Sequence, residues 1–553
     1  MSVLAYMPYG AGGIIIRVES DIRRGIPGVD ITGLAEGAVR EARERVRAAF
    51  RNSGFSFPLD RILINLAPAG MKKDGAALDL PIALSVMAAA GIAPVSGNLL
   101  VMGELELSGK IRPVRGVLAA IAAGLAEGIT EFIVPAQNAG EAAILASEGN
   151  MFNKSARFTA ANSLQEAVHA LFIREEKGAL PASHGTEPAC NYKHENLGYR
   201  FTGCSLDENC GGFNDENTGD FCDVKGQAVY KRALEIAAAG GHNVLVFGPP
   251  GAGKTMLARR MPSIMAPLSP TEAVEVTRLY SLAGPLSNNG GFIDRLITRP
   301  PFRSPHHSAS AEGILGGGRI PRPGEISLAH FGVLFLDEAP EFRINVLQAL
   351  REPLEDRVIS IVRAEGLLRL PAEFQLIMSA NSCPCGRLGM RETDSICFCS
   401  PEEVNRYWRR FGGALLGRVE IRVAVLPPKI EEIGRQCSFN QEDTASDSSE
   451  IARRVINAVE IQKQRFKGTV IRRNALLPAG KIESLCPMNE KAENAFHKAT
   501  AKLGLSGRAY HGILRVSRTI ADLEAKELIE AEHILEAVHY RRLGEDPWDI
   551  LSL

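Results

Sequence analysis

The stretch that decides the fold is VLVFGPPGAGKTMLARRM, residues Val244–Met261. An apolar run typical of a buried strand leads into a glycine-rich turn, and a helix-forming segment follows directly. The turn matches the pattern G-x-x-x-x-G-K-T, whose glycines let backbone N–H groups point at phosphate oxygens near the positive end of the next helix. A chance glycine-rich turn is the weaker alternative, because strand and helix flank it as a phosphate site requires.

A second element follows in FGVLFLDEAPEF, Phe331–Phe342, where a continuous apolar strand ends in two carboxylates. Asp337 is placed to hold a metal ion through water, and Glu338 can polarise the water that attacks a γ-phosphate. The alternative is an acidic surface turn after a core strand, which the preceding phosphate loop makes less attractive. Together the two elements predict a nucleotide hydrolase.

A third buried strand, EFQLIMSAN (Glu373–Asn381), ends in Asn381, whose amide suits orienting the lytic water. Strand, acidic pair, strand and terminal Asn resemble the layout of an AAA+ ATPase, with Asn381 as sensor 1. The expected cofactors are ATP and Mg²⁺, with Mg²⁺ held by Thr255 and Asp337 and the β- and γ-phosphates reached by Lys254. The expected nucleotide-binding residues are Gly248, Pro249, Pro250, Gly251, Ala252, Gly253, Lys254, Thr255 and Asp337.

Length and composition limit the remaining possibilities. At 553 residues the chain exceeds one hydrophobic core, so two to four domains are expected. The net charge of −1 indicates no global basic field, so any nucleic-acid contact must come from a local patch or a ring of subunits. The N-terminus lacks a secretory signal, and the most apolar run, Leu80–Val95, is too short to span a membrane. A cytoplasmic, reducing location is expected.

The predicted fold class is α/β, with five segments along the chain. Residues 1–173 alternate strand-like and helix-like patterns, and 174–223 are irregular and polar. Residues 224–428 read as a parallel α/β core, 429–449 as a polar linker, and 450–553 as a bundle of amphipathic helices. In the first segment, Gly12–Ser20 and Arg61–Pro68 are predicted strands. A helix is predicted over 33–54, with Gly54 as its C-cap and one apolar face formed by Leu34, Val39, Ala42, Val46, Ala49 and Phe50.

Two Cys-x-Cys pairs lie in Asn381–Ser400, directly after sensor 1. In a reducing compartment four soft ligands suit a tetrahedral Zn²⁺, and a closed four-cysteine site is structural because it leaves no open coordination position. Four reduced thiols without metal remain the alternative. The expected zinc ligands are Cys383, Cys385, Cys397 and Cys399. A second group in the irregular segment is too unevenly spaced to assign, and unrelated thiols are the simplest interpretation of Cys190, Cys204, Cys210 and Cys222.

Long segments resemble the YifB/ComM family of magnesium-chelatase-like AAA+ proteins. They are FRSPHHSASAEGILGGGRIPRPGEISLAHFGVLFLDEAPEF, NSCPCG with CFC, LSGRAYHGILRVSRTIADLE, and GLAEGAVREARERVRAAFRNSGFSFPLDRILINLAPAGMKKDGAALDLPIAL near the N-terminus. The resemblance covers nearly the whole chain. It implies a homo-hexameric, ATP-dependent DNA helicase that drives branch migration of recombination or natural-transformation intermediates.

The resemblance also implies roles for three arginines. Arg418 matches the arginine finger that reaches a neighbouring subunit's γ-phosphate, although Gly417 stands where Asp is usual and Ala414 where Pro is usual. A surface arginine after a helix is the alternative. Arg508 matches sensor 2, with Arg515 as the fallback. Arg363 lies near the tip of a segment that resembles the pre-sensor-1 hairpin; it is either a DNA-backbone contact or simply an exposed hairpin arginine.

The N-terminal segment is similar to the Lon protease domain, which shares the fold of ribosomal S5 domain 2. A Ser–Lys dyad needs a hydroxyl nucleophile and an amine base. Ala77 stands where the Ser belongs and Leu118 where the Lys belongs, so no active protease is expected. The segment is interpreted as a scaffold or nucleic-acid-binding module. Two other functions remain open: the ATPase subunit of a magnesium chelatase, and an AAA+ remodeller of protein complexes.

Overall fold

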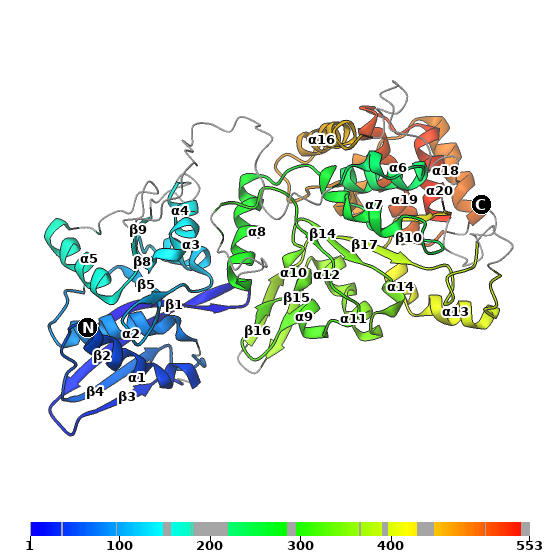
Figure 1. Ribbon diagram of the computed structural model, residues 1–553. Coiled ribbons are helices and arrows are strands. Elements are labelled where there is room, and N and C mark those ends of the chain that lie inside the picture. Colours follow the sequence, from blue (N-terminus) through cyan, green and yellow to red (C-terminus); the bar gives the residue numbers. More distant parts are fainter. Residues whose placement is uncertain are drawn as a thin grey trace.

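The computed structural model describes residues 2–34, 37–73, 75–95, 97–147, 156–178, 180, 219–284, 293, 295–363, 366–389, 396–427, 447–503 and 505–542. Figure 1 shows an N-terminal α/β region, a central sheet covered by helices, and a C-terminal group of helices. The predicted fold class is confirmed. In the described ranges, no helix combines the length and apolarity needed to cross a membrane.

The N-terminal region is built on a mixed seven-stranded sheet of order β3-β4-β2-β1-β5-β8-β9. Antiparallel pairing joins β1 to β2 and β2 to β4, whereas the remaining neighbours are parallel. The strands are β1 (Ser2–Tyr9), β2 (Gly12–Arg23), β3 (Gly28–Thr32), β4 (Arg61–Ala67), β5 (Leu99–Val101), β8 (Glu131–Pro135) and β9 (Arg157–Ala161), with a small separate hairpin of β6 (Glu104–Leu105) and β7 (Ile111–Arg112). The helices are α1 (Gly37–Asn52), α2 (Asp79–Ala89), α3 (Val117–Ala126), α4 (Ala139–Ser147) and α5 (Leu164–Lys177).

The prediction of the apolar face of α1 is wrong for one residue. The five other predicted apolar residues are buried, and Gly54 has the left-handed φ of 79° expected after a helix end. Leu34 instead precedes the helix, has φ 56° and is 54% exposed. Its side chain cannot share the helix face because the backbone turns before α1 begins.

The central region contains a parallel five-stranded sheet of order β11-β14-β17-β10-β18. Its strands are β10 (Val244–Phe247), β11 (Phe302–Arg303), β14 (Val333–Leu336), β17 (Gln375–Ala380) and β18 (Ile421–Ala424). Two hairpins project beside it, β12 (Gly316–Gly317) with β13 (Arg322–Pro323), and β15 (Val358–Arg363) with β16 (Gly366–Pro371). The helices are α6 (Ala228–Gly240), α7 (Lys254–Arg259), α8 (Pro270–Ala283), α9 (Ala311–Leu315), α10 (Glu325–Leu328), α11 (Ile344–Ala349), α12 (Arg351–Asp356), α13 (Pro401–Arg409) and α14 (Gly413–Leu416).

Both faces of this sheet are buried, which explains its continuous apolar strands. Val244 and Val246 face a core that includes α6 and the C-terminal helices, whereas Leu245 and Phe247 face a second core that includes α11 and α13. The C-terminal helices are α16 (Ser448–Arg465), α17 (Ala479–Leu485), α18 (Glu490–Leu503), α19 (Gly507–Leu523) and α20 (Ala531–Arg542). They therefore form one layer on the sheet.

The structure describes both ends of the segment 174–223, which was predicted as an irregular linker. Helix α5 continues to Lys177 and is capped by Gly178, so residues 174–177 are helical rather than irregular. At the other end, Phe221 is fully buried in the core shared with the sheet. Cys190, Cys204 and Cys210 lie outside the described residues, so the interpretation of that group stays a prediction.

The N-terminal and central regions meet along α3 and α8. The backbone N–H of Gly116 donates to the carbonyl of Ser281 (3.0 Å), and the Ser281 hydroxyl donates to the buried carboxylate of Glu141. The turn between β1 and β2 also reaches the central hairpins, because Gly10 donates to the carbonyl of Pro321 (3.0 Å) and lies against Leu368. No sequence pattern predicted these contacts.

Candidate nucleotide and metal sites

The phosphate loop connects β10 to α7 at the carboxyl edge of the central sheet. Gly251 and Gly253 have left-handed φ values of 78° and 81°, which favour glycine. At Gly248, a Cβ atom would lie 2.0 Å from the carbonyl oxygen of Val425, so a side chain is excluded there. The predicted glycine positions therefore have a structural reason, and the loop takes the shape that a phosphate cradle needs.

Lys254 brings the loop and sensor 1 together. Its Nζ atom donates to the carbonyls of Gly248 (2.6 Å) and Pro249 (2.9 Å) and to Oδ1 of Asn381 (3.1 Å). β10 and β17 are parallel neighbours, so the loop after β10 and Asn381 after β17 open at the same edge. Two residues 127 positions apart in sequence are thus in direct contact.

The acidic pair follows β14 at the same edge. Asp337 accepts hydrogen bonds from the hydroxyl of Thr255, at 3.0 Å and 3.2 Å, and from the hydroxyl of Ser379. The Ser379 hydroxyl also accepts from the backbone N–H of Glu338 (2.9 Å), whose φ is 49°. A hydroxyl and a carboxylate side by side are hard oxygen ligands of the kind that Mg²⁺ prefers. Sequence reasoning missed Ser379, and the only signal for it was a hydroxyl inside an otherwise apolar strand.

Burial makes the charge of Lys254 sensitive to pH. Desolvation lowers the pKa of Lys254 to about 8, against the opposing attraction of Asp337 and Glu338. Lysine binds a phosphate as a cation, so the fraction of protein ready to bind falls as pH rises through that value. At about one pH unit above the pKa, only about a tenth of the side chains stay charged.

We therefore expect ATP affinity to be constant between about pH 6.5 and 7.5 and to fall about tenfold by pH 9. The measurement is the dissociation constant of a fluorescent ATP analogue at each pH. Lys254→Arg is the control, because a guanidinium stays charged over this range and its affinity should not change with pH. A wild-type affinity as flat as that of Lys254→Arg would contradict this prediction.

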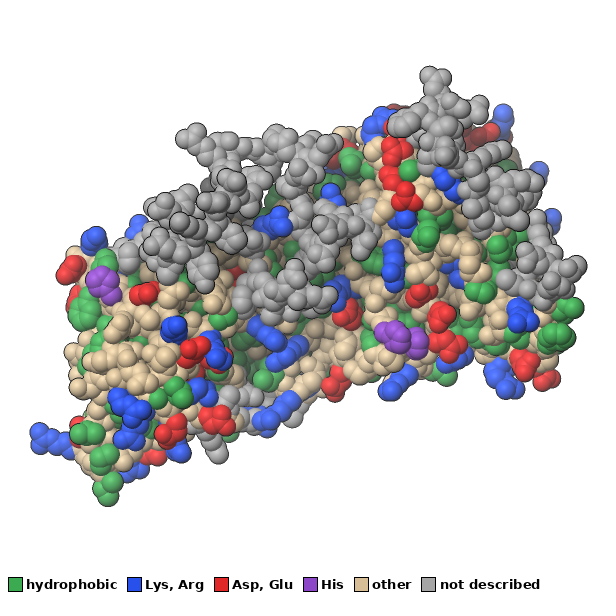
Figure 2. All heavy atoms as spheres, in the orientation of Figure 1, with side chains coloured by type: hydrophobic (Ala, Val, Ile, Leu, Met, Phe, Trp, Pro, Cys, Tyr) green, Lys and Arg blue, Asp and Glu red, His purple; other side chains and the backbone are tan. Residues whose placement is uncertain are grey.

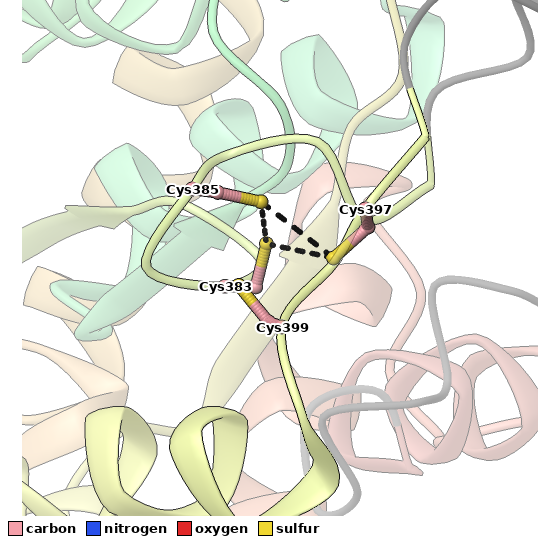
Figure 3. Close-up of side chains that lie close together, drawn as sticks. All are labelled: Cys383, Cys385, Cys397 and Cys399. Carbon is pink, nitrogen blue, oxygen red and sulfur yellow. Dashed lines mark hydrogen bonds between the residues drawn. The ribbon is translucent and has the colours of Figure 1, made fainter.

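The four cysteines after sensor 1 form a compact cluster, drawn in Figure 3. The Sγ atom of Cys383 lies 3.4 Å from that of Cys385 and 3.7 Å from that of Cys397, and Cys385 and Cys397 are 3.6 Å apart. The four sulfurs, including that of Cys399, lie within 4.8 Å of one another. A tetrahedral zinc site with Zn–S bonds of about 2.3 Å has sulfurs about 3.8 Å apart. The donor set and its spacing fit Zn²⁺.

One further observation favours a metal over free thiols. The backbone N–H of Leu388 points at Sγ of Cys383 (3.4 Å), a bond that stabilises a thiolate. Burial raises the pKa of Cys383 to about 12, so without a cation this sulfur stays protonated at neutral pH. In the described part of the chain, Cys222 and Cys486 stand outside this cluster.

The cysteine loop contacts the nucleotide site. A Cβ atom at Gly386 would lie 3.1 Å from Cδ of Pro250 in the phosphate loop. The indole N–H of Trp408 donates to the carbonyl of Ser382 (3.0 Å), and the hydroxyl of Tyr407 accepts from the backbone N–H of Asn381 (3.3 Å). The loop is therefore fixed between sensor 1, the phosphate loop and α13.

Arg418 and Arg508 lie together, away from this edge. Arg418 precedes β18, and its carbonyl accepts from the side chain of Asn243, the residue just before β10. Because β10 and β18 are parallel, this is the amino edge of the sheet, about 13 Å of strand away from the phosphate loop. Arg508, at the start of α19, pairs with Glu355 (3.4 Å), and so does Arg418. Arg515, the fallback for sensor 2, donates to the carbonyl of Leu477.

Arg363 ends β15, beside the turn of the hairpin. Its guanidinium donates to the carbonyls of Gly318 and, at 3.3 Å, Arg319, both in the turn of the β12–β13 hairpin. Val362 and Leu367 near the same turn are 80% and 56% exposed. Arg363 thus joins two adjacent hairpins, one of which also receives the N-terminal β1–β2 turn.

The two positions of the N-terminal region that match the Ser–Lys dyad of Lon proteases carry neither a serine nor a lysine. Leu118 is fully buried in α3, where its backbone N–H donates to the carboxylate of Glu141 (2.9 Å). Ala77 lies in a short 3₁₀ turn over Ala76–Leu78. An alkyl side chain at each position offers neither nucleophile nor base.

Comparison with protein families matches three parts of the chain to magnesium chelatase models. Residues 220–433 match the model described as magnesium chelatase, subunit ChlI. Residues 18–138 match subunit ChlI of Mg-chelatase, and residues 445–541 match the C-terminal part of that subunit.

Individual relatives cover nearly the full length. Competence protein ComM of Haemophilus influenzae is 39% identical over 536 residues, 97% of this chain and 96% of that protein. YifB of Salmonella typhimurium, an uncharacterized protein, is 38% identical over 531 residues, 96% of this chain and 94% of its own. A Lon protease of Salinispora arenicola is 28% identical over 136 residues, 23% of this chain and 18% of the protease.

The resemblance inferred from the motifs is therefore confirmed, and with it the Lon-like N-terminal region; membership of an ATPase family implies ATP hydrolysis. Identity above a third along the whole chain, together with the phosphate loop and acidic pair described above, leads to one assignment. This protein belongs to the ComM/YifB family of magnesium-chelatase-like AAA+ ATPases.

Proposed function

We propose that this protein is a homo-hexameric, ATP-dependent DNA motor that promotes branch migration of recombination or natural-transformation intermediates. The observation that carries the proposal is the meeting of Lys254, Thr255, Asp337 and Asn381 at one edge of the sheet. Such a group binds and hydrolyses a nucleotide; binding alone would not need the acidic residue Glu338 beside it. A DNA substrate places this activity in the cytoplasm.

Each residue at this edge takes one role. The phosphate loop, from Gly248 to Gly253, cradles the β- and γ-phosphates of ATP, and the Lys254 ammonium neutralises part of their charge. Thr255 and Asp337 would hold Mg²⁺, which supplies further neutralisation of the phosphates when bound. Glu338 accepts a proton from the attacking water, and Asn381 orients that water.

The position of Arg418 supports a ring. At the amino edge of the sheet, its side chain cannot reach the phosphate loop of its own subunit. An arginine finger in this place acts only on a neighbour, in a head-to-tail assembly in which every subunit gives a finger and receives one. A closed ring of six such contacts gives the proposed hexamer.

DNA as the substrate rests on the family resemblance, with support from the hairpins. In Figure 2 basic and acidic side chains are interspersed on the face shown, in line with the net charge of −1. One Arg363 per subunit gives little affinity, but six copies around a channel give a salt-dependent grip on phosphates. The exposed Val362 and Leu367 beside it offer apolar contacts to bases.

We propose a structural role for zinc. A closed set of four thiolates leaves no position for substrate, so the chemistry of this metal is limited to holding the loop. The loop carries Gly386 against Pro250 and begins two residues after Asn381. Bound zinc would thereby fix both the sensor and one wall of the phosphate loop.

Two alternatives use the same ATPase site. A magnesium chelatase subunit is favoured by the names of the matching family models, and a remodeller of protein complexes by the AAA+ core alone. DNA-stimulated ATP hydrolysis separates the proposed motor from both. Copurification with porphyrin-binding subunits would favour the chelatase.

We expect single-stranded or branched DNA to raise the rate of ATP hydrolysis, and Arg363→Ala to remove most of that increase with the DNA-free rate unchanged. The physical reason is that Arg363 joins the two hairpins, which contain none of the residues of the nucleotide site. The measurement is ATP turnover against DNA concentration at two salt concentrations. Arg369→Ala, on the same hairpin but farther from its turn, is the matched control. If no DNA changes the rate of ATP hydrolysis, the proposed DNA motor is wrong.

A further inference from the structure

Glu355 joins the two arginines that lie at the amino edge of the sheet. It lies in α12, and its carboxylate accepts from Arg418 through Oε2 and from Arg508 through Oε1, at 3.4 Å for the second pair. Helix α12, the turn before β18 and the C-terminal helix α19 are thereby connected through one side chain. Glu355 belongs to none of the sequence motifs described above.

The two guanidiniums need a carboxylate between them. Arg418 and Arg508 both reach Glu355, and a Cβ atom at Gly417, the residue before Arg418, would lie 3.8 Å from Cδ of Arg508, so Arg508 packs against the turn that carries Arg418. Burial lowers the pKa of Arg515, and the charges of Arg357 and Arg508 add to this effect, so further cations lie nearby. Like charges at this spacing repel one another, and a shared anion offsets that repulsion.

Part of each guanidinium stays available for a further anion. Arg418 uses Nη1 for one bond to the carbonyl of Ala414 (2.8 Å) and Nη2 for one bond to Glu355, and each of these nitrogens carries a second N–H. A guanidinium has five N–H donors, so both arginines retain donors after these bonds. Two guanidinium groups held side by side suit a phosphate group, which accepts several hydrogen bonds at once.

We propose that Glu355 is a positioning residue that holds Arg418 and Arg508 together for the γ-phosphate of the neighbouring subunit. The inference rests on the proposed ring ATPase and adds to it in two ways. It assigns Arg508 to the neighbour's site together with Arg418, and it assigns a carboxylate to both. Glu355 is assigned no contact with the nucleotide, because its negative charge would repel the phosphates that the two arginines attract.

The first test separates turnover from binding. Glu355→Ala should lower kcat for ATP about ten- to a hundredfold, as expected for misplaced catalytic groups, and leave KM within about twofold. Glu355→Gln keeps the shape and one of the two acceptor oxygens but loses the charge and the other acceptor, so it should lie between Glu355→Ala and wild type. Asp356→Ala, an exposed carboxylate next along α12, is the matched control and should turn over like wild type. Thermal unfolding and ring size of every variant exclude misfolding as the cause.

The second test asks on which subunit Glu355 acts. Subunits of Glu355→Ala and Lys254→Ala, each inactive or nearly so, are mixed before ring assembly. A Glu355→Ala subunit has an intact phosphate loop, and its Lys254→Ala neighbour supplies intact arginines. In random equimolar rings about one interface in four has this combination, so about a quarter of wild-type turnover should return.

The two tests distinguish a wrong role for Glu355 from a wrong ATPase site. If Lys254→Ala alone hydrolyses ATP at the wild-type rate, the proposed ATPase site is wrong and the inference falls with it. If Lys254→Ala is inactive but mixing restores nothing, Glu355 acts within its own subunit and the inference is overturned. A wild-type kcat for Glu355→Ala would also overturn it.

Discussion

Replacing Glu338 with glutamine is expected to stop ATP hydrolysis while ATP binding persists. The amide keeps the size of the side chain and the backbone position fixed by Ser379, but it cannot accept a proton from water. Loss of a general base lowers kcat by roughly a hundred- to ten-thousandfold. The measurements are steady-state phosphate release and the dissociation constant for ATP, which should stay within about twofold of wild type.

Glu341→Gln provides the matched control for this substitution. It lies in the same turn, three residues along the chain, and pairs with Arg410 (3.5 Å) on the protein surface. Its turnover should equal that of wild type. Equal loss in both variants would mean that the turn is damaged by any change of charge, and unchanged turnover in Glu338→Gln would exclude Glu338 as the base.

Breaking the four-cysteine cluster is expected to remove zinc and, with it, most ATP turnover. Cys397→Ser changes one sulfur that is only half-buried, so the loss of packing is small compared with the loss of a ligand. Wild-type protein should contain about one zinc per chain, and the variant far less. Turnover should fall at least about tenfold, because the loop that holds Asn381 and lies against Pro250 loses its fixed shape.

The control is Cys486→Ser, which replaces a buried cysteine in the C-terminal helices outside the cluster. It should keep zinc and turnover, although a polar atom in that core lowers stability. Metal content is measured on protein purified without added zinc, and a chelator should reproduce the Cys397→Ser result on wild type. A metal-free wild-type protein with full turnover would show that the four thiols are not a zinc site.

The parts of the site that follow motifs could be predicted from the sequence. Lys254, Asp337 and Asn381 each end a buried strand or begin a helix, and parallel strands bring such ends to one edge. The four cysteines could be predicted as a candidate zinc site because their ligand type and their pairing along the chain suit Zn²⁺. For these residues local pattern and three-dimensional position are linked by simple geometry.

Other residues depend on contacts between distant segments, and no local pattern reveals them. Ser379 is one hydroxyl in an apolar strand, and only the neighbouring strand shows that it bridges the acidic pair. Glu355 is an ordinary charged residue on a short helix until β18 and α19 place arginines beside it. The prediction for Leu34 is wrong for a different reason. Its spacing in the sequence fits the helix face, but the backbone turns before the helix starts.

The central claim is that ATP hydrolysis in this protein moves DNA, and dissociation of a synthetic four-way DNA junction tests it most directly. Wild-type protein with ATP and Mg²⁺ should separate the junction into its arms, and Glu338→Gln should bind the junction and ATP without separating it. Junctions left intact by a wild-type protein that hydrolyses ATP at full rate would contradict the motor.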